Sequence, residues 1–152
     1  MPSLERLHTT APWLEVATTA DDWATASAER LGTMLTSLQL VRAFEETVLE
    51  LAGEGLVHGP AHSSIGQEGV AVGCCGSLRG SDQVNGSHRG HHVFLAKALA
   101  FLADRFDPTA EIAPEVESLL HRTLAEIAGL AEGFCKGRGG SMHLRWPEAG
   151  VL

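Results

Sequence analysis

The residues best suited to chemistry stand in one short stretch, GSHRGHHVFLAKAL, from Gly86 to Leu99. Arg89 and three histidines, His88, His91 and His92, lie at the start of an apolar run that is typical of a helix. The arginine guanidinium offers a planar set of donors that fits phosphate oxygens, and the first turn of a helix favours an anion. Imidazoles add donors whose charge changes near neutral pH. The cluster indicates an anion site, with a solvated turn and an N-capping histidine as the alternative.

A second candidate is the glycine-rich stretch CKGRGGSMHL, from Cys135 to Leu144, which carries Lys136 and Arg138. It lacks the GxxxxGK[ST] order of a Walker A loop. Flexible glycines beside basic residues suit a loop that closes over a negatively charged ligand or docks on a partner. An ordinary surface loop is the alternative.

His58 and His62 are four residues apart, a spacing that on a helix could suit a metal ion. Gly59 and Pro60 stand between them, and a regular helix is not expected across a proline. The HExxH spacing is also absent. We therefore expect no metal ligands in this sequence and keep a zinc-dependent hydrolase built on the histidines only as an alternative.

Length and composition narrow the class of protein. The chain has 152 residues, 44% of them hydrophobic, and a net charge of −8, which argues against nucleic-acid or anionic-membrane partners. No apolar run approaches the roughly 20 residues of a membrane span, and no signal-peptide pattern is present. The odd number of cysteines, Cys74, Cys75 and Cys135, gives no disulfide framework. We expect reduced thiols and a cytoplasmic location.

Elements that could position these residues follow from the apolar periodicity. Apolar residues recur at three- and four-residue steps from Leu31 to Leu51, which predicts a long amphipathic helix, capped by Ser27 and ended by Gly53. Further helices are predicted over 67–78, where Ser63 or Ser64 could cap, over 91–103 and over 111–132 with a break at Gly129, and a short strand over 82–87. The glycines of 67–78 predict close packing against another element. Residues 1–26, with Trp13 and Trp23, are expected to form an N-terminal arm before a domain over 27–152.

Taken in series, HSSIGQEGVAVG, SHRGHH and GRGGSMHL resemble the α-subunit of thiamine-diphosphate-dependent 2-oxo acid dehydrogenases, which include pyruvate, branched-chain and acetoin dehydrogenase first components. The resemblance runs from about Leu31 to Leu152. It implies an α/β fold class, of which this chain would be the mostly helical N-terminal half. The doubly wound parallel sheet of that thiamine-diphosphate-binding fold would be incomplete without a partner chain.

The resemblance also implies roles for individual residues. His62 matches a histidine that faces the substrate end of the active-site channel, and His91 matches one near the phosphates or substrate, so both are expected to be catalytic. His88 and Arg89 match a Tyr-Arg pair that contacts the cofactor diphosphate, with His88 in place of the tyrosine. His143 lies in a segment, 139–143, that matches a loop beside the cofactor. Gln67 and Glu68 match a motif with a structural role at a subunit contact.

The family α-subunit continues with a Gly-Asp-Gly motif and an asparagine that hold Mg²⁺, and this sequence has neither. The resemblance therefore implies thiamine diphosphate as cofactor, with Mg²⁺ ligands on a partner chain. The expected partners are a C-terminal-half α chain, a β-subunit and a lipoyl-bearing acyltransferase. The expected reaction is decarboxylation of a 2-oxo acid, or cleavage of an acyloin, with transfer of the acyl unit. A non-catalytic assembly subunit of such a complex is the alternative.

Overall fold

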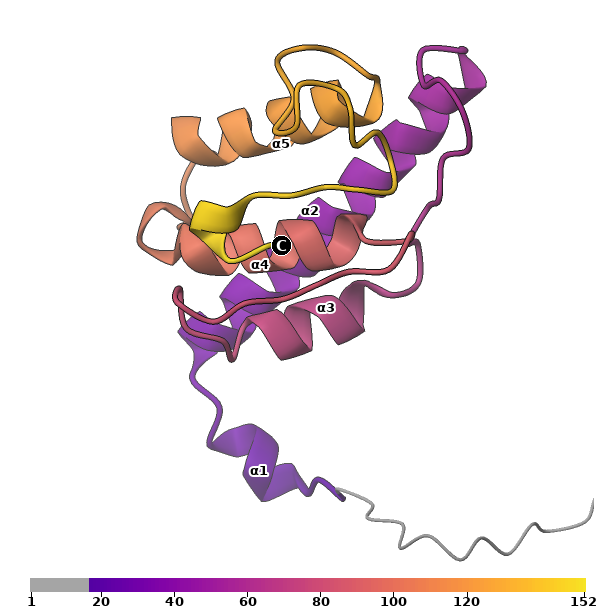
Figure 1. The fold of residues 1–152 in the computed structure, drawn as a ribbon. Helices are drawn as coiled ribbons and strands as arrows, with labels where there is room; N and C mark the ends of the chain where they lie inside the picture. Colours follow the sequence, from indigo (N-terminus) through magenta and orange to yellow (C-terminus); the bar gives the residue numbers. More distant parts are fainter. Residues whose placement is uncertain (1–16) are drawn as a thin grey trace, which may run out of the picture.

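The computed structural model describes residues 17–152, and its regular structure is almost entirely helical (Figure 1). In that part of the chain the α-helices are α1 (Ala20–Ala24), α2 (Ala28–Gly53), α3 (Glu68–Cys75), α4 (His91–Phe101) and α5 (Pro114–Ile127), with 3-10 turns at Ala103–Arg105 and Pro147–Ala149. The prediction of a mostly helical chain is confirmed. The parallel sheet of the wider fold stays a prediction.

The strand predicted over 82–87 does not form. Between residues 17 and 152, extended pairing is limited to two isolated bridges, one parallel between Val84 and Val151 and one antiparallel between Trp146 and Val151. A strand needs a neighbour along its whole length, and here the segment meets only the last residues of the chain.

Helix α2 follows its sequence signals closely. The Ser27 hydroxyl accepts a hydrogen bond from the backbone N–H of Arg30 at 3.1 Å, as predicted for an N-cap. The apolar stripe buries Val41, Phe44 and Val48. The helix ends at Gly53, as predicted.

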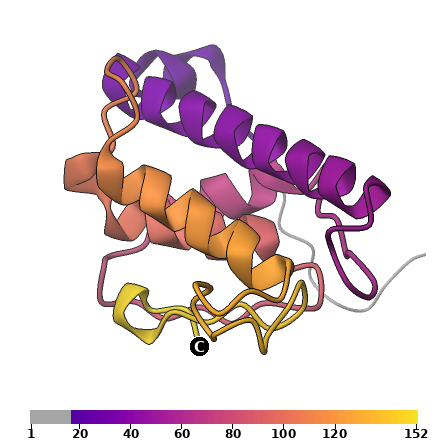
Figure 2. The ribbon, with the colours of Figure 1, turned by 90° about the horizontal axis from the view of Figure 1, so that it is seen from above.

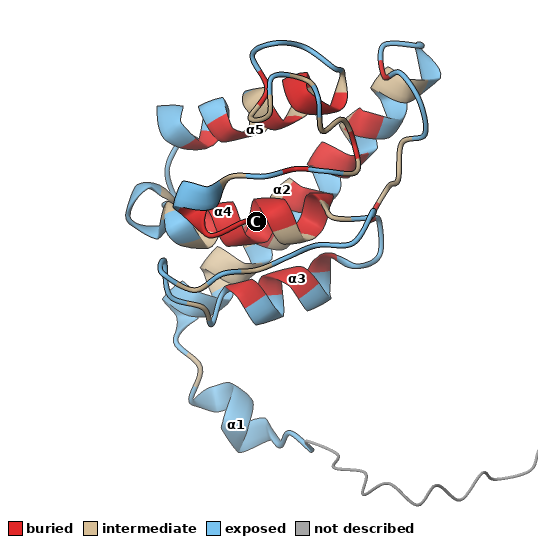
Figure 3. Ribbon diagram, viewed as in Figure 1, coloured by how far each residue is buried: buried red, intermediate tan, exposed pale blue. Residues whose placement is uncertain are grey.

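Helix α4 lies at the centre of the molecule. Figure 2 shows α2 on one side of it and the C-terminal segment on the other, and Figure 3 shows that the buried surfaces of the helices face inward. The core joins residues of α2, α4, α5 and the C-terminal segment: Val41, Phe44, Val48, Phe94, Leu95, Ala98, Leu99, Val116, Leu119, Ile127, Leu144 and Val151. Burial of this apolar surface is the main force that fixes the ends of α4 relative to the loops around it.

Lys97 is a charged residue inside this core, with no exposed surface. Its Nζ donates hydrogen bonds to the backbone carbonyls of Arg79 at 3.2 Å and Gly80 at 3.3 Å. A buried ammonium needs such acceptors, because an unpaired charge in the core is costly. Lys97 thereby ties the loop after α3 to the middle of α4.

Helix α3 is shorter than the predicted 67–78, and neither Ser63 nor Ser64 caps it. Its buried side consists of Glu68, Ala71, Val72 and Cys75. Gly69 and Gly73 are exposed, and a Cβ at either position would have open space around it. Helix α3 packs against Ala96 of α4, as predicted for a helix of small residues, but through Ala71, Val72 and Cys75 and not through these two glycines.

Only residues 17–26 of the predicted N-terminal arm are described by the structure. Trp13 lies outside the described residues. Trp23 lies on α1, which buries none of its residues and lies apart from the other helices in Figure 1, and the Trp23 side chain is largely exposed.

No helix of residues 17–152 combines the length and apolar character that crossing a bilayer requires. All three cysteines are unpaired, with Cys75 buried and Cys74 exposed.

An ion pair joins α2 to the start of α3. Arg42 Nε lies 2.7 Å from Glu68 Oε1, and the backbone N–H of Gly66 also donates to the Glu68 carboxylate. The hydrogen bond from Arg42 outweighs the opposing effect of burial and lowers the pKa of Glu68 from 4.5 to about 2.

Replacing Arg42 by Met should therefore reduce stability in a pH-dependent way. Because the folded-state pKa of Glu68 lies below the unfolded value, the pair stabilises the fold above pH 4.5, and this contribution is lost as the pH falls toward about 2. Urea unfolding of both proteins across this range should show a difference that is largest near neutral pH and shrinks in acid. Arg105→Met, at an exposed pair with Asp104, is the control. A difference independent of pH would contradict the assignment.

Candidate functional site

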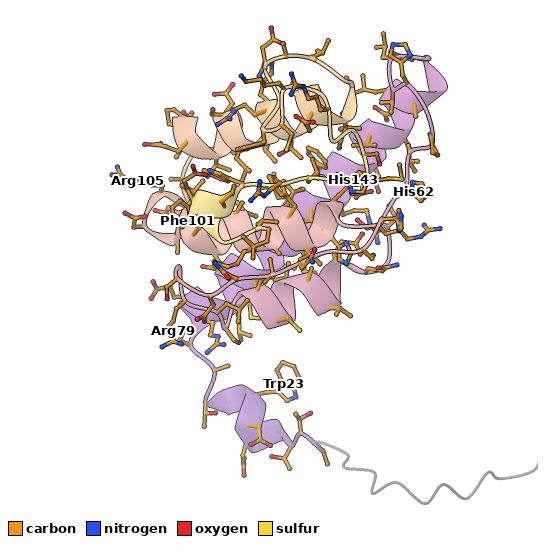
Figure 4. The ribbon with its side chains drawn as sticks, viewed as in Figure 1. Trp23, His62, Arg79, Phe101, Arg105 and His143 are labelled. Carbon is orange, nitrogen blue, oxygen red and sulfur yellow. The ribbon has the colours of Figure 1, made fainter. Side chains whose placement is uncertain are left out.

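Three loops meet at the N-terminal end of α4 and bring together three histidines. The His88 ring centroid lies 6.0 Å from that of His62 and 6.3 Å from that of His143. Figure 4 shows His62 and His143 toward the same edge of the molecule, on the other side from Arg79 and Arg105. Histidines that are far apart in the sequence thus form one surface.

His62 contributes a half-buried ring to this surface. Its backbone N–H donates to Ser141 Oγ at 3.1 Å, which fixes the loop before α3 against the glycine-rich segment. The ring Nδ1 is buried and has no hydrogen-bond partner among the described residues. A buried polar atom without a partner is unusual in a folded protein, and Oγ of Ser64 and Nδ1 of His92 share this property near the same end of α4.

Arg89 lies beside the histidines with an exposed side chain. Its Nη1 donates to the Ser63 carbonyl at 2.8 Å, and its backbone N–H donates to Ser87 Oγ at 3.3 Å. The first bond joins the Arg89 turn to the loop that carries His62. The remaining guanidinium N–H groups have no hydrogen bond to the described residues, so they are able to meet an anion.

The turn before α4 requires a glycine at position 90. A Cβ at Gly90 would come within 2.9 Å of the Ser87 carbonyl oxygen, closer than real side chains come. Helix α4 then begins at His91, as the sequence predicts.

His91 lies beside the candidate site but inside the protein. Its side chain is fully buried, with Nδ1 2.8 Å from Glu45 Oε1 and Nε2 2.9 Å from both the backbone oxygen and Oγ of Ser141. Both ring nitrogens are engaged by the protein itself, so the ring has no atom free for a substrate or phosphate. We therefore revise the prediction of a catalytic His91 to a positioning role. The neighbouring His92 is also buried, and burial lowers its pKa.

Glu45 is the residue that orients His91. Its Oε2 accepts the backbone N–H of Ser64 at 2.8 Å. Although burial raises the pKa of Glu45, the hydrogen bonds from His91 and Ser64 outweigh burial, and the pKa is lowered overall. One ionised carboxylate on α2 therefore holds both the loop of His62 and, through His91 and Ser141, the glycine-rich loop.

Glu126 plays a similar part for the glycine-rich loop itself. It is fully buried, and the backbone N–H groups of Cys135, Gly137 and Gly139 all donate to its carboxylate. These three amides are therefore not free for an external anion, and the closing of this loop over a ligand or its docking on a partner stays a prediction. Its basic side chains, Lys136 and Arg138, are exposed.

The sequence reasoning missed Glu45, Glu126 and Ser141. A signal was present for the two acids, because each interrupts an apolar stripe: Glu45 lies beside Phe44 in the stripe of α2, and Glu126 beside Ile127 in that of α5. An acid at an apolar position of a helix indicates a buried carboxylate that needs donors. Ser141 gave no comparable signal.

A cavity of about 390 Å³ adjoins this surface. Its polar and basic lining includes Asn85, Ser87, Arg138, His143 and Arg145. Within residues 17–152, no group of three or more histidine, cysteine, aspartate or glutamate side chains could hold a metal ion. Arg138, Arg145 and His143 offer cationic or titratable nitrogens beside the amide of Asn85 and the hydroxyl of Ser87, which suits an anionic ligand.

Comparison with known proteins identifies the relatives of this chain. It is 37% identical over 112 residues to the α-subunit of an acetoin:2,6-dichlorophenolindophenol oxidoreductase from Bacillus subtilis. The aligned segment covers 74% of the chain and 28% of the relative. It is 35% identical over 120 residues to the pyruvate dehydrogenase E1 component α-subunit of Zymomonas mobilis, covering 78% of the chain and 28% of the relative. The chain is homologous to a segment of these α-subunits.

The resemblance that the three motifs predicted is thereby confirmed. A Cupriavidus necator acetoin:2,6-dichlorophenolindophenol oxidoreductase α-subunit matches as well, at 32% identity over 82% of the chain and 32% of the relative. The chain thus spans about 30% of the length of these α-subunits. No family model and no solved structure matches.

Proposed function

We propose that this chain forms one wall of a thiamine-diphosphate site in a 2-oxo acid or acetoin dehydrogenase, as an α-subunit or part of one. The observation that carries the proposal is the meeting of His62, His88, His143 and Arg89 at the end of α4 in a chain homologous to such α-subunits. In this proposal the predicted domain over 27–152 carries the wall.

The residues present fit the anionic end of such a cofactor. The guanidinium of Arg89 is exposed, and His88 and His143 add two imidazoles on the same surface. Such donors are suited to a diphosphate. They do not fit Mg²⁺, which prefers oxygen ligands, so its ligands are expected outside these residues.

Thiamine diphosphate, when bound, supplies the chemistry that breaks the carbon–carbon bond beside the carbonyl of a 2-oxo acid or acyloin. In the proposal, Arg89 and His88 bind the diphosphate and fix the orientation of the cofactor. The His62 imidazole donates or accepts a proton at the substrate end, and His143 borders the cofactor from the glycine-rich loop. Glu45 and His91 touch no ligand and hold these loops in register.

The proposal includes partners that the chain alone does not supply. The relatives' names describe α-subunits, in two cases of an acetoin oxidoreductase and in another of a pyruvate dehydrogenase E1 component. We therefore infer a β-subunit, a chain or segment that carries the Mg²⁺ ligands, and a lipoyl-bearing acyl acceptor. A cytoplasmic location belongs to the same proposal.

Replacing Arg89 by Ala should weaken thiamine diphosphate binding by about 10- to 100-fold, the effect of losing hydrogen bonds to a charged group. The measurement is calorimetric titration of thiamine diphosphate with Mg²⁺ into the complex purified through a tag on this chain. Arg79→Ala is the matched control, because Arg79 is an exposed arginine that pairs with Asp82 on the other side of the molecule. Equal affinities of wild type and Arg89→Ala would show that the anchoring role is wrong.

The same complex decides between catalysis and the alternative of a non-catalytic assembly subunit. If the subunit is catalytic, the wild-type complex binds the cofactor and turns over substrate. His62→Ala then abolishes turnover, whereas His58→Ala, at an exposed histidine of the same loop, leaves it unchanged. A complex that assembles but binds no thiamine diphosphate would favour the assembly role.

A further inference from the structure

The glycine-rich loop after α5 is built around a single buried carboxylate. Glu126 Oε2 accepts the backbone N–H of Cys135 at 2.7 Å and of Gly137 at 3.0 Å, and Oε1 accepts that of Gly139 at 2.7 Å. Glu126 has no exposed surface. Three amides from alternate residues therefore converge on one anion, the arrangement by which protein backbones also bind phosphate.

The glycines of this loop are explained by its contact with the end of α5. A Cβ at Gly133 would overlap the backbone of Glu126, one at Gly137 would overlap the backbone of Gly129, and one at Gly139 would overlap the His143 carbonyl. Each of these neighbours belongs to the chain itself. The glycines permit the loop to approach α5 and to fold back on itself, and no external ligand is needed to account for them.

Backbone strain in the loop also indicates that the Glu126 carboxylate holds the loop in place. Lys136 has a φ of +59°, a conformation that a non-glycine residue adopts only at a cost. Lys136 lies between Cys135 and Gly137, whose amides both bind the same Glu126 oxygen. Such strained residues persist where surrounding bonds over-determine them. The Glu126 carboxylate supplies those bonds on both sides of Lys136.

The loop leads directly into the candidate site. The backbone N–H of His143 donates to the Gly139 carbonyl at 3.2 Å, so a residue bound to Glu126 also bonds to His143. Ser141, between them, contacts His91 and the backbone of His62. The positions of His143 and Ser141 therefore depend on how the segment before them is held.

We propose that Glu126 is a positioning residue, whose carboxylate serves as the internal anion of the glycine-rich loop and presets His143 and Ser141 in the site before any ligand binds. The relevance to thiamine diphosphate rests on the function proposed above. The folding of the loop around Glu126 does not depend on it.

The test compares Glu126→Gln with wild type by hydrogen–deuterium exchange of the full chain without cofactor. A glutamine keeps the size of the side chain but replaces one acceptor oxygen by an NH₂ group, so all three amides can no longer be satisfied. We expect exchange over residues 135–139 to accelerate by about 10- to 100-fold, as for loss of hydrogen bonds to a charged group, with α2 and α4 still protected. Glu132→Gln, at an exposed acid just before the loop, should leave exchange unchanged.

A second variant covers the case in which Glu126→Gln does not fold. Glu126→Asp keeps the charge but shortens the side chain by one methylene, so exchange in the loop should rise above that of wild type, and α2 and α4 should remain protected. Unchanged loop exchange in either variant would overturn the proposal. Exchange that rises equally in α2 and α4 would also overturn it, because Glu126 would then serve the whole fold.

Cofactor titration of the complex separates this inference from the proposed function. Weaker thiamine diphosphate binding in Glu126→Gln, together with faster loop exchange, supports the positioning role in the site. If the wild-type complex itself binds no thiamine diphosphate, the proposed function is overturned, and with it the positioning role for the cofactor. Faster loop exchange in Glu126→Gln would in that case still support Glu126 as the internal anion of the loop.

Discussion

Replacing Glu45 by Gln is expected to lower the free energy of unfolding by about 1–3 kcal/mol, the range for a buried hydrogen-bonding group that loses its partner. The Glu45 carboxylate has no exposed surface and accepts from both the His91 ring and the Ser64 backbone. A glutamine offers only one oxygen, so either the imidazole or the backbone N–H faces an NH₂ group and stays unsatisfied.

The effect should also depend on pH. Hydrogen bonds hold the folded-state pKa of Glu45 below its ordinary value of 4.5, so its contribution is present above that pH and declines as the pH falls below it. Chemical denaturation of wild type and Glu45→Gln should thus show the largest difference near neutral pH.

A neighbouring acid provides the control. Glu46 is adjacent on α2 and exposed, and Glu46→Gln is expected to change stability by no more than about 0.5 kcal/mol. If Glu45→Gln were as mild as this control, the network of Glu45, His91 and Ser141 would not hold the site together.

Replacing Gly137 by Ala is the second change with a large expected effect. Gly137 has a φ of +71°, and its added Cβ would overlap the backbone of Gly129 and lie 2.8 Å from the Leu130 nitrogen. The unfavourable φ costs about 1–3 kcal/mol. Overlap with rigid backbone adds about 1–3 kcal/mol more, since neither atom belongs to a side chain that could rotate away.

Gly140 in the same loop is the matched control. It also has a positive φ, +57°, but a Cβ there would meet no heavy atom within 4 Å. Gly140→Ala should therefore cost only the conformational part, about 1–3 kcal/mol, and chemical denaturation should show Gly137→Ala to be the less stable variant. Equal losses would mean that the loop does not pack against the end of α5 as described.

Much of the fold could be predicted from the sequence because its signals are local. The Ser27 cap and the three- and four-residue apolar steps define α2, since a cap and a helical face need only neighbours along the chain. The start of α4 at His91 and the break at Gly129 were predicted for the same reason, although α5 covers only Pro114–Ile127 of the predicted 111–132. The strand over 82–87 was wrong because pairing depends on a second segment, which here is the single residue Val151.

The sequence by itself determined which residue types are available for chemistry. Arg89 stands next to His88, and three motifs lie in an order shared with acetoin and pyruvate dehydrogenase α-subunits. Only the tertiary structure decided which of these side chains face outward. His91 turns inward although it stands two residues from the exposed Arg89, because Glu45 and Ser141, from distant segments, supply the partners that make a buried imidazole stable. A buried polar group is positioned by contacts far away in the sequence, and no local pattern can reveal them.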